Sequence, residues 1–325
     1  MSWDEIRRVE WIAGRAPSPH NTQPWRLVYE QDRIRLDYDP SRHLKESDPQ
    51  KRDLLLALGG FVESLLIASR EARVGLQFIP DMELQSCRIG WFYPASDLYT
   101  TPFTSDDVLK RQTSRLIYRP ARMDAALERA IRGVLSPADR IMFVQGSAVR
   151  DLLGTADRHL LDTADIASEF RQWSRLKPAE IASSRDGMTA QCLALNRLEA
   201  QVLSALLSDN VYPWFRRLRL SAIVSGVTRR LVAPGADLIA LVRPARDPFQ
   251  ALDAGRSLLR LWLTLGRAEL HAQPLSQVLD CPETAARIAA RLQPGVENEI
   301  LCLFRFGISN APARSRRLGD MDRKS

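Results

Sequence analysis

The chain passes twice through the same order of predicted elements, and this repeat constrains its fold more than any other feature. Each round reads helix, Ser-Pro dipeptide, strand, glycine-containing helix and strand. The two dipeptides are Ser18-Pro19 and Ser136-Pro137, and the two helices contain Gly60 and Gly255. The identity between the rounds is weak, so coincidence is the alternative to duplication. A duplication buries one half against the other, like a homodimer fused in one chain.

The second round is longer than the first. The Ser-Pro offset is 136 − 18 = 118 residues, whereas the glycine offset is 255 − 60 = 195, so the second round carries 195 − 118 = 77 extra residues. The excess falls at about 150–230, where the pattern is mostly helical. We therefore expect a first half at 1–105, a second half at 106–325, and a helical insertion within the second half.

Hydrophobic periodicity places the elements of both rounds. It predicts strands at 25–29, 33–38, 74–79, 141–144, 238–242 and 300–306, and helices at 3–14, 50–72, 124–133 and 248–265. The strand at 33–38 alternates Ile34, Leu36 and Tyr38 with polar residues, which is typical of a half-buried strand, and the strand at 300–306 also alternates apolar residues. The tail from Ser309 to Ser325 is polar and basic and shows no periodicity.

Composition excludes several classes of protein. With 325 residues and 45% apolar residues, the chain has ample material for a core. No stretch is long and apolar enough for a membrane helix, and the acidic start at Trp3-Asp4-Glu5 does not resemble a signal peptide. Four scattered cysteines suit a reducing cytosol, so we expect a cytoplasmic protein. The four histidines lack metal-ligand spacing, and motifs of P-loop NTPases, Rossmann dehydrogenases and α/β-hydrolases are missing.

Arginine dominates the basic residues. Five of the 46 basic residues are lysines, which leaves 46 − 5 = 41 arginines, and the net charge is +7. The planar guanidinium binds phosphate through two parallel hydrogen bonds, so this bias directs attention to a phosphate-bearing ligand. A GC-rich genome produces the same bias and is the simpler explanation for most of these residues.

The most distinctive segment is Ala16-Pro-Ser-Pro-His-Asn-Thr-Gln-Pro-Trp25, between a helix and a strand. Its three prolines hold small and polar residues in a rigid loop. The segment resembles the A-P-S-x-x-N-x-Q-P-W signature of the nitroreductase-like FMN flavoproteins. That resemblance implies that Pro17, Ser18, Pro19 and Asn21 contact the flavin ring, and that Gln23, Pro24 and Trp25 hold the loop.

A second segment, Arg111-Gln-Thr-Ser-Arg115, offers two guanidinium groups and two hydroxyls within five residues, which suits a phosphate. It resembles the R-x-S-x-R/K element of the same family, with threonine in place of serine. The resemblance assigns Arg111, Gln112 and Thr113 to the FMN phosphate and ribityl chain, and Arg115 to the N1/O2 side of the flavin. A cation there stabilises reduced flavin.

Two weaker segments complete the site that the resemblance implies. In Ala311-Pro-Ala-Arg-Ser-Arg-Arg317, Arg314 and Arg316 match the basic element that closes on the FMN phosphate, with Arg317 as the competing choice. In Gln273-Pro-Leu-Ser-Gln277, the family places a proline loop whose backbone N–H points at flavin N5. Pro274, Ser276 and Gln277 are the candidates there.

The arrangement of these motifs implies the fused-dimer, single-chain branch of the family. The ring-covering loop occurs only in the first round, so we expect one FMN per chain, built across both halves of an α+β nitroreductase-like fold with mixed or antiparallel sheets flanked by helices. Arg185-Asp-Gly-Met188 in the helical stretch also resembles that branch. We expect the stretch 150–230 to cap the flavin as a lid.

The resemblance implies ping-pong hydride transfer through flavin N5, from NAD(P)H or a small organic donor to a nitroaromatic or quinone-like acceptor. It requires no catalytic side chain and no metal. Two alternatives remain: a flavin-sequestering protein with little turnover, and a biosynthetic flavin dehydrogenase. The expected partner is a small molecule, with no nucleic acid or membrane. A monomer is plausible because the dimer is fused, and further dimerisation is compatible with the sequence. The aromatic and basic segment 211–220 has two interpretations, a membrane-surface or nucleic-acid patch and a packed helix with a charged outer face, of which the packed helix is favoured.

Overall fold

The computed structural model describes residues 3–119, 121–233, 236–244, 247–295 and 298–323. The first half holds a four-stranded antiparallel sheet in the order β1-β2-β4-β3. Its strands are β1 (Trp25–Tyr29), β2 (Ile34–Tyr38), β3 (Leu76–Glu83) and β4 (Arg88–Pro94). Its helices are α1 (Asp4–Ala13), α2 (Arg52–Glu71) and α3 (Ser105–Lys110), with short 3-10 turns η1 (Pro19–Asn21) and η2 (Pro40–Arg42).

The second half holds another four-stranded antiparallel sheet, in the order β5-β8-β10-β9. Its strands are β5 (Arg140–Gln145), β8 (Asp237–Arg243), β9 (His271–Pro274) and β10 (Glu299–Gly307). Its helices are α4 (Ala125–Arg132), α12 (Pro248–Arg267), α13 (Gln277–Asp280) and α14 (Pro282–Leu292), and the 3-10 turn η3 (Leu318–Arg323) follows β10.

The two sheets share one topology. When the strands of each half are numbered in chain order, both sheets read first, second, fourth, third, and the long helix follows the second strand in both. The position of the long helix is shared as well as the order of the strands. The shared topology therefore supports two diverged halves in an α+β fold.

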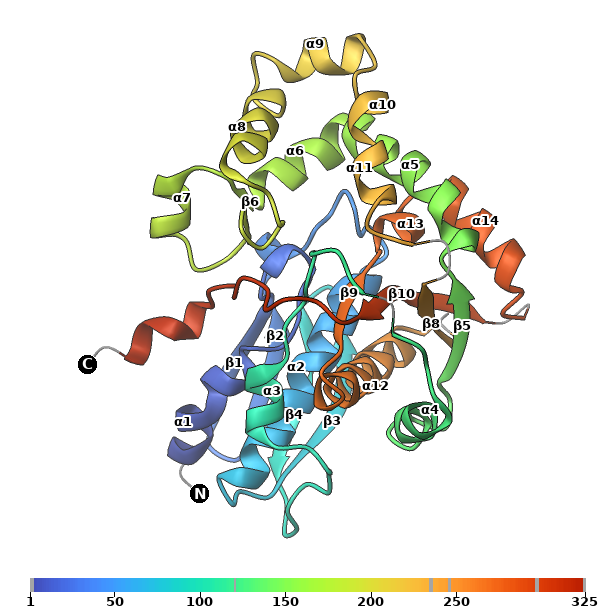
Figure 1. The fold of residues 1–325 in the computed structure, drawn as a ribbon. Coiled ribbons are helices and arrows are strands. Elements are labelled where there is room, and N and C mark those ends of the chain that lie inside the picture. The colour runs from blue at the N-terminus through green and yellow to red at the C-terminus, as the bar shows by residue number, and fades with distance from the viewer. Residues whose placement is uncertain (1–2, 120, 234–235, 245–246, 296–297, 324–325) are drawn as a thin grey trace.

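The long helices α2 and α12 cross at two glycines (Figure 1). A Cβ on Gly59 would lie 1.9 Å from the carbonyl oxygen of Leu252, and a Cβ on Gly255 would lie 2.3 Å from the carbonyl oxygen of Leu56. These contacts are reciprocal, because 252 − 56 and 255 − 59 both equal 196. Reciprocity of this kind is the mark of a two-fold interface. The partner of Gly255 is therefore Gly59, and the alignment of Gly60 with Gly255 is wrong by one residue.

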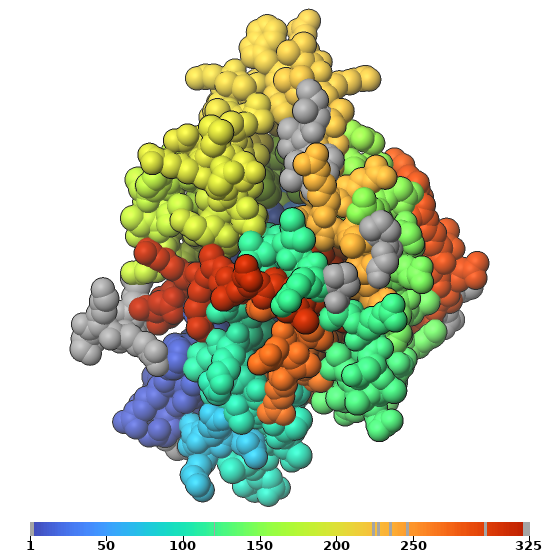
Figure 2. All heavy atoms as spheres, in the orientation of Figure 1, coloured from blue at the N-terminus to red at the C-terminus, as the bar shows by residue number. Residues whose placement is uncertain are grey.

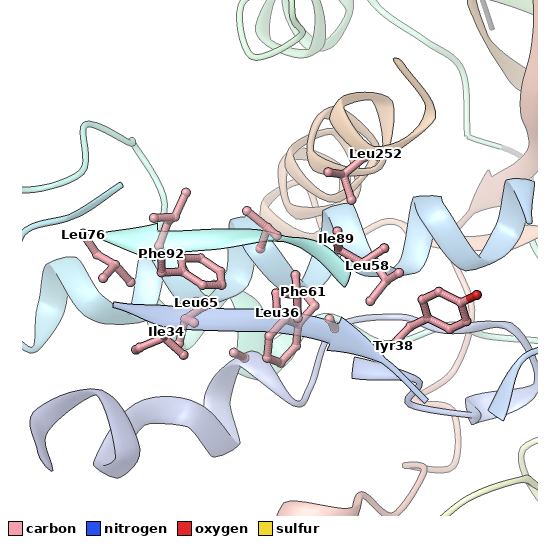
Figure 3. Packing of buried hydrophobic residues seen from close by; sticks show 14 of the residues in the cluster. Ile34, Leu36, Tyr38, Leu58, Phe61, Leu65, Leu76, Ile89, Phe92 and Leu252 are labelled. Carbon is pink, nitrogen blue, oxygen red and sulfur yellow. The ribbon is translucent and has the colours of Figure 1, made fainter. Parts of the chain in front are cut away.

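The core of the first half lies between its sheet and α2. Every residue of α2 from Leu54 to Ser69 is buried, as expected for a helix covered on all sides. Figure 3 shows side chains of β2, such as Leu36, packed against Phe61 of α2, with Leu252 of α12 entering the same cluster. Leu56 of α2 enters the core of the second half in return. Both cores thus extend across the crossing and hold the halves together.

Residues 146–236, between β5 and β8, form the insertion. It contains α5 (Ser147–Asp162), α6 (Ala164–Gln172), α7 (Pro178–Ser183), α8 (Arg197–Leu206), α9 (Tyr212–Arg217), α10 (Ser221–Val224) and α11 (Gly226–Arg229), with the short parallel pair β6 (Ser174–Arg175) and β7 (Met188–Thr189). The corresponding connection in the first half is the short β1–β2 hairpin. In Figure 1 helices α6 to α9 lie above the loop that contains η1.

The predicted helices and strands are present, and the structure adds elements that were not predicted. Strands β4 and β9 and helices α3, α13 and α14 were not among the predicted elements; β9, α3 and α13 are short, with four to six residues each. Strand β10 is buried on both faces: every residue from Ile300 to Gly307 is buried, since β10 is a central strand of its sheet. Among the described helices, none has the length and apolar character that crossing a membrane requires.

Candidate functional site

The loop from Ala16 to Trp25 is strained where its polar residues lie. His20, Asn21 and Gln23 all have positive φ, at 47°, 58° and 52°. Residues other than glycine rarely adopt a positive φ. Each such backbone conformation costs of order 1–3 kcal/mol of folding free energy, so the surrounding contacts must hold it in place. The Ser18 hydroxyl contributes by accepting a hydrogen bond from the Gln23 N–H at 3.0 Å. A loop strained in this way is typical of a ligand-binding segment.

Two arginines, the half-buried Arg111 and the buried Arg317, lie beside this loop without acidic partners. Arg111 ends α3, and Arg317 approaches from the C-terminal segment and donates to the carbonyl of Ala16 at 3.3 Å. Within the described part of the chain, no carboxylate lies within ion-pair distance of either guanidinium, and the Nε atom of each is buried without a hydrogen-bond partner. Burying an unpaired cation is costly unless an anion joins it.

The electrostatics of the cluster are unfavourable without an anion. Burial, together with the cations of Arg15 and Arg314, lowers the pKa of Arg111 to about 10. Burial and the cations of Arg111 and Arg15 lower the pKa of Arg317 to about 9. Arginine stays protonated in proteins, so these shifts express repulsion within the cluster. A phosphate group bound among these arginines would relieve it.

The three candidate arginines of the C-terminal segment, Arg314, Arg316 and Arg317, have different partners. Arg314 is exposed, donates to the carbonyl of Leu109 at 2.6 Å and is one of the cations that lower the pKa of Arg111. Arg316 instead donates to the carbonyls of Ile181 and Ala182 in α7. The structure therefore brings Arg314 and Arg317 to Arg111 and directs Arg316 toward the insertion. Figure 2 shows the C-terminal segment in red, crossing this face below the insertion.

Thr113 and Gln112 lie beside Arg111. Thr113 forms a bridge with Ala272 of β9, and its hydroxyl accepts from the Arg111 guanidinium at 3.4 Å. Gln112 and Arg111 line a cavity of about 410 Å³ that also includes Trp262 and His271. The segment 111–113 thus runs along the edge of the second sheet and faces an open cavity.

Arg115 is held by the insertion. Its guanidinium donates to the carbonyl of Cys192 at 3.1 Å and approaches the Met188 sulfur at 3.6 Å. Burial lowers its pKa. Arg115 therefore lies under residues 188–192 and belongs to a buried site.

The insertion also contacts the loop directly. The Asn21 amide donates to the carbonyls of Gly187 and Arg316, both at 3.1 Å, while its own side-chain oxygen has no partner among the described residues. The Gln23 amide donates to the carbonyl of Arg185 at 3.0 Å. The segment Arg185–Met188 is thus attached to the strained loop, so part of the insertion covers this site.

His20 lies inside the enclosed region. Its ring meets Phe170 of α6 edge-on at 5.7 Å, and its Nδ1 atom is buried without a partner in the described structure. Burial and the nearby cation of Arg115 lower the pKa of His20 to about 4, although Asp53 acts in the opposite direction. His20 is therefore neutral near pH 7. It stood in the sequence motif but was not among the predicted site residues.

The segment 274–277 ends β9 and begins α13. Pro274 pairs with Phe304 of β10, and Ser276 and Gln277 form the first turn of α13. Behind them Arg305, which is fully buried, donates to the Gln273 side chain at 2.7 Å and stacks 3.8 Å from the Tyr118 ring. Arg305 was not among the predicted site residues, although a charged residue within an apolar strand was a signal for it.

These residues place the cations of Arg111 and Arg317 beside a strained polar loop, and the segment Arg185–Met188 of the insertion is hydrogen-bonded to that loop. Such a site can hold an elongated ligand that carries a phosphate. Among the described residues there is no group of histidine, cysteine and carboxylate side chains placed to hold a metal ion.

No family model matches the chain. A relative from Mycobacterium tuberculosis strain H37Rv, “Putative NAD(P)H nitroreductase Rv3131”, is 37% identical over 304 residues, which cover 89% of this chain and 81% of the relative. A second relative of the same organism, Acg, with the same descriptive name, is 36% identical over 72 residues, which is 22% of either chain.

Solved structures overlap with a smaller share of the chain. The FMN- and NADPH-dependent nitroreductase NfnB of a Sphigopyxis strain is 16% identical with a TM-score of 0.40, and covers 67% of this chain and 96% of its own. NfnB of Mycobacterium smegmatis, solved in complex with NADPH, is 16% identical with a TM-score of 0.37, with the same coverage. These scores are low, so the assignment depends on Rv3131, which matches along most of its length.

The fold is an α+β fold built from two halves, and a cluster of arginines lies beside its strained loop. By its similarity to Rv3131, the chain belongs to the nitroreductase family.

Proposed function

We propose that the chain binds one FMN and acts as an FMN-dependent oxidoreductase of the nitroreductase type. The observation that carries this proposal is the pair of buried guanidiniums, Arg111 and Arg317, that lack a carboxylate partner in the described structure. Family membership indicates the flavin, and the phosphate of FMN is the anion that this pair lacks.

The chain's own residues have distinct tasks in this proposal. Arg111, Arg317 and Arg314 hold the phosphate, with Gln112 and Thr113 beside it, and the loop of Pro17, Ser18, Pro19 and Asn21 holds the ring system. Arg115 supplies a positive charge at the covered end of the site. Pro274, Ser276 and Gln277 are proposed to approach the flavin from the second sheet, and Arg316 binds the insertion instead. When bound, FMN supplies hydride transfer between NAD(P)H or a small organic donor and an electron-poor acceptor.

The insertion is proposed to act as a lid over the cofactor. It excludes water from the buried arginines, which strengthens their interaction with an anion in a medium of lower dielectric constant. Its hydrogen bonds to Asn21, Gln23 and Arg115 keep it closed in this structure. Those contacts also favour a second candidate function, in which the protein sequesters FMN and reacts slowly with nicotinamide nucleotides.

One experiment tests the proposal and separates the two functions. The purified protein is analysed for FMN per chain and then mixed anaerobically with NADPH or NADH while the flavin absorbance is followed. Rapid bleaching with reoxidation by a quinone or nitroaromatic supports the oxidoreductase. Tightly held FMN that neither nucleotide bleaches supports sequestration. A protein that binds no FMN, or two per chain, contradicts the proposal.

A further inference from the structure

The reciprocal crossing of α2 and α12 relates the residues of the two helices. Because Leu56 corresponds to Leu252 and Gly59 to Gly255, Gly60 corresponds to Arg256 and Ser64 to Arg260. Gly60 lies beneath the strained loop, where a Cβ would come within 3.7 Å of the Pro17 ring. The position related to the proposed FMN site therefore carries two arginines in place of a glycine and a serine.

A cavity exists at that related position. It measures about 420 Å³ and is lined by residues 99–102, by residues 133–137 and by Asp253, Arg256 and Arg260 of α12. Residues 133–137 correspond to the start of the strained loop: Gly133 follows α4 as Gly14 follows α1, and Ser136-Pro137 corresponds to Ser18-Pro19. The loop in the second half lacks the Asn-x-Gln-Pro-Trp continuation. The side chains that line this cavity therefore differ from those at the first site.

The charges at this cavity leave capacity for an anion. Arg256 donates to the buried carboxylate of Glu63 at 3.0 Å and to the Tyr99 hydroxyl at 3.2 Å. Arg260 reaches the same Glu63 oxygen only at 3.7 Å, and its Nε atom is buried with no partner in the described structure. Glu63 thus faces two cations. The acidic lining residue Asp253 pairs with Arg243 at 2.7 Å, and Arg243 also lies 3.4 Å from the buried carboxylate of Asp139. Among the described residues, the unpartnered donor at this cavity is therefore the Nε atom of Arg260.

Hydroxyl groups stand around these cations. Thr100, Thr101 and Ser136 line the cavity with Arg256 and Arg260. Guanidinium groups together with hydroxyls are the donors that bind phosphate and carboxylate oxygens. The volume exceeds that of an inorganic oxyanion and admits a small group attached to it.

We propose that this cavity is a second ligand site that binds a small phosphate monoester and excludes flavin. Flavin is excluded because the side chains of Arg256 and Arg260 occupy the positions that Gly60 and Ser64 leave open in the first site. The proposal holds whether or not the first site is an enzyme's active site. The residues that line the second cavity come from α12, from Tyr99–Pro102 and from the loop after α4.

The test uses equilibrium dialysis of the full chain, as purified with its cofactor, against labelled inorganic phosphate and against glycerol phosphate. We expect one molecule of glycerol phosphate per chain, and weaker binding of phosphate. Arg260→Gln should weaken both by at least about tenfold, as expected for losing a charge-assisted contact. Arg260→Lys should recover part of the binding, and the exposed Arg129→Gln on α4 should leave it unchanged.

Three outcomes would overturn the proposal: no binding of either probe up to about 10 mM, equal binding by the wild type and a folded Arg260→Gln variant, or loss of binding in Arg111→Gln instead. The last outcome would place the anion in the first site. A chain that holds no FMN contradicts the proposed function but leaves this measurement intact, since Arg111→Gln and Arg260→Gln report on different sites.

Discussion

Asn21 and Gly187 bind each other in both directions. The Asn21 side-chain amide donates to the carbonyl of Gly187 at 3.1 Å, and the Gly187 N–H donates to the carbonyl of Asn21 at 3.3 Å. One residue belongs to the strained loop of the first half and the other to the insertion of the second half. The pair shows that the loop expected to contact the cofactor and the segment expected to cover it are fixed to one another.

Asp186, next to this pair, is expected to control opening of the insertion. Its carboxylate accepts from Arg175 at 2.8 Å and from Arg42 at 3.1 Å, and all three side chains are largely buried. Asp186→Asn should release the insertion, because it removes two partly buried charge pairs worth about 1–3 kcal/mol together. We expect faster proteolysis within 176–192 and faster release of FMN.

The matched control is Asp209→Asn, which removes a carboxylate that is 84% exposed and pairs with Arg171 in the same insertion. It should change neither rate by more than about twofold, because exposed ion pairs contribute little. Equal behaviour of both variants would show that Asp186 does not hold the insertion closed.

Arg111→Gln should separate stability from cofactor binding. Because the guanidinium is buried among other cations, its removal should leave the FMN-free protein equally stable or up to about 2 kcal/mol more stable. FMN affinity should fall by about 10- to 100-fold through loss of a charge-assisted hydrogen bond to phosphate. Flavin fluorescence titration measures the affinity, and urea unfolding measures the free energy of unfolding.

The comparison of Arg317→Gln with Arg316→Gln tests which arginine of the C-terminal segment serves the site. Arg317→Gln should behave like Arg111→Gln, because burial and the nearby cation of Arg111 lower the pKa of Arg317 in the folded protein. Arg316→Gln should retain FMN within about threefold, since its donors bind carbonyls of α7. The reverse order of affinities would contradict this placement.

Because a two-fold relationship connects Gly59 and Gly255, alanine at either position should lower the stability of the protein by a similar amount. Gly59→Ala and Gly255→Ala each place a Cβ within 2.3 Å of a backbone oxygen of the opposite helix, so each should destabilise the protein by about 3 kcal/mol or more. Gly60→Ala is the control: its Cβ has contacts of 3.7 Å or longer, and alanine favours a helix by about 0.5–1 kcal/mol. Thermal unfolding measures all three, and a strong loss in Gly60→Ala would contradict the crossing geometry.

His20 should add a pH dependence to stability between about pH 6.5 and pH 4. Its pKa falls from 6.5 to about 4 on folding, so in this window the unfolded chain binds the additional proton. Stability therefore falls as the pH falls through the window, by up to about 3 kcal/mol. The raised pKa of Asp48, about 7 because of burial and the nearby Asp53, acts in the opposite direction. The effect of His20 is therefore measured as a difference between wild type and His20→Gln.

That difference is obtained from urea unfolding of the FMN-free proteins at pH 7 and pH 4.5. Wild type should lose more stability than His20→Gln between these two values. Identical losses would show that His20 is not held neutral by its surroundings.

The sequence by itself determined the elements that depend on local pattern. Periodicity located α1, α2, α12 and most strands, because burial of one face or of a whole helix is written within a single segment. The Ala16–Trp25 segment also identified the family that the similarity to Rv3131 supports, since its prolines and polar residues stand together in the chain. The sequence also located the insertion, because the helical pattern of residues 150–230 lies within one continuous stretch of the chain.

Only the tertiary structure decided which residues meet. Arg314, Arg316 and Arg317 are near neighbours with the same chemistry, yet only Arg317 is buried beside Arg111, because the path of the C-terminal segment across the loop turns that residue inward. The choice of Gly59 over Gly60, the burial of both faces of β10 and the cavity at Arg256 and Arg260 likewise arise from contacts between segments far apart in the chain. Such contacts depend on how the two halves pack, and no local pattern encodes that packing.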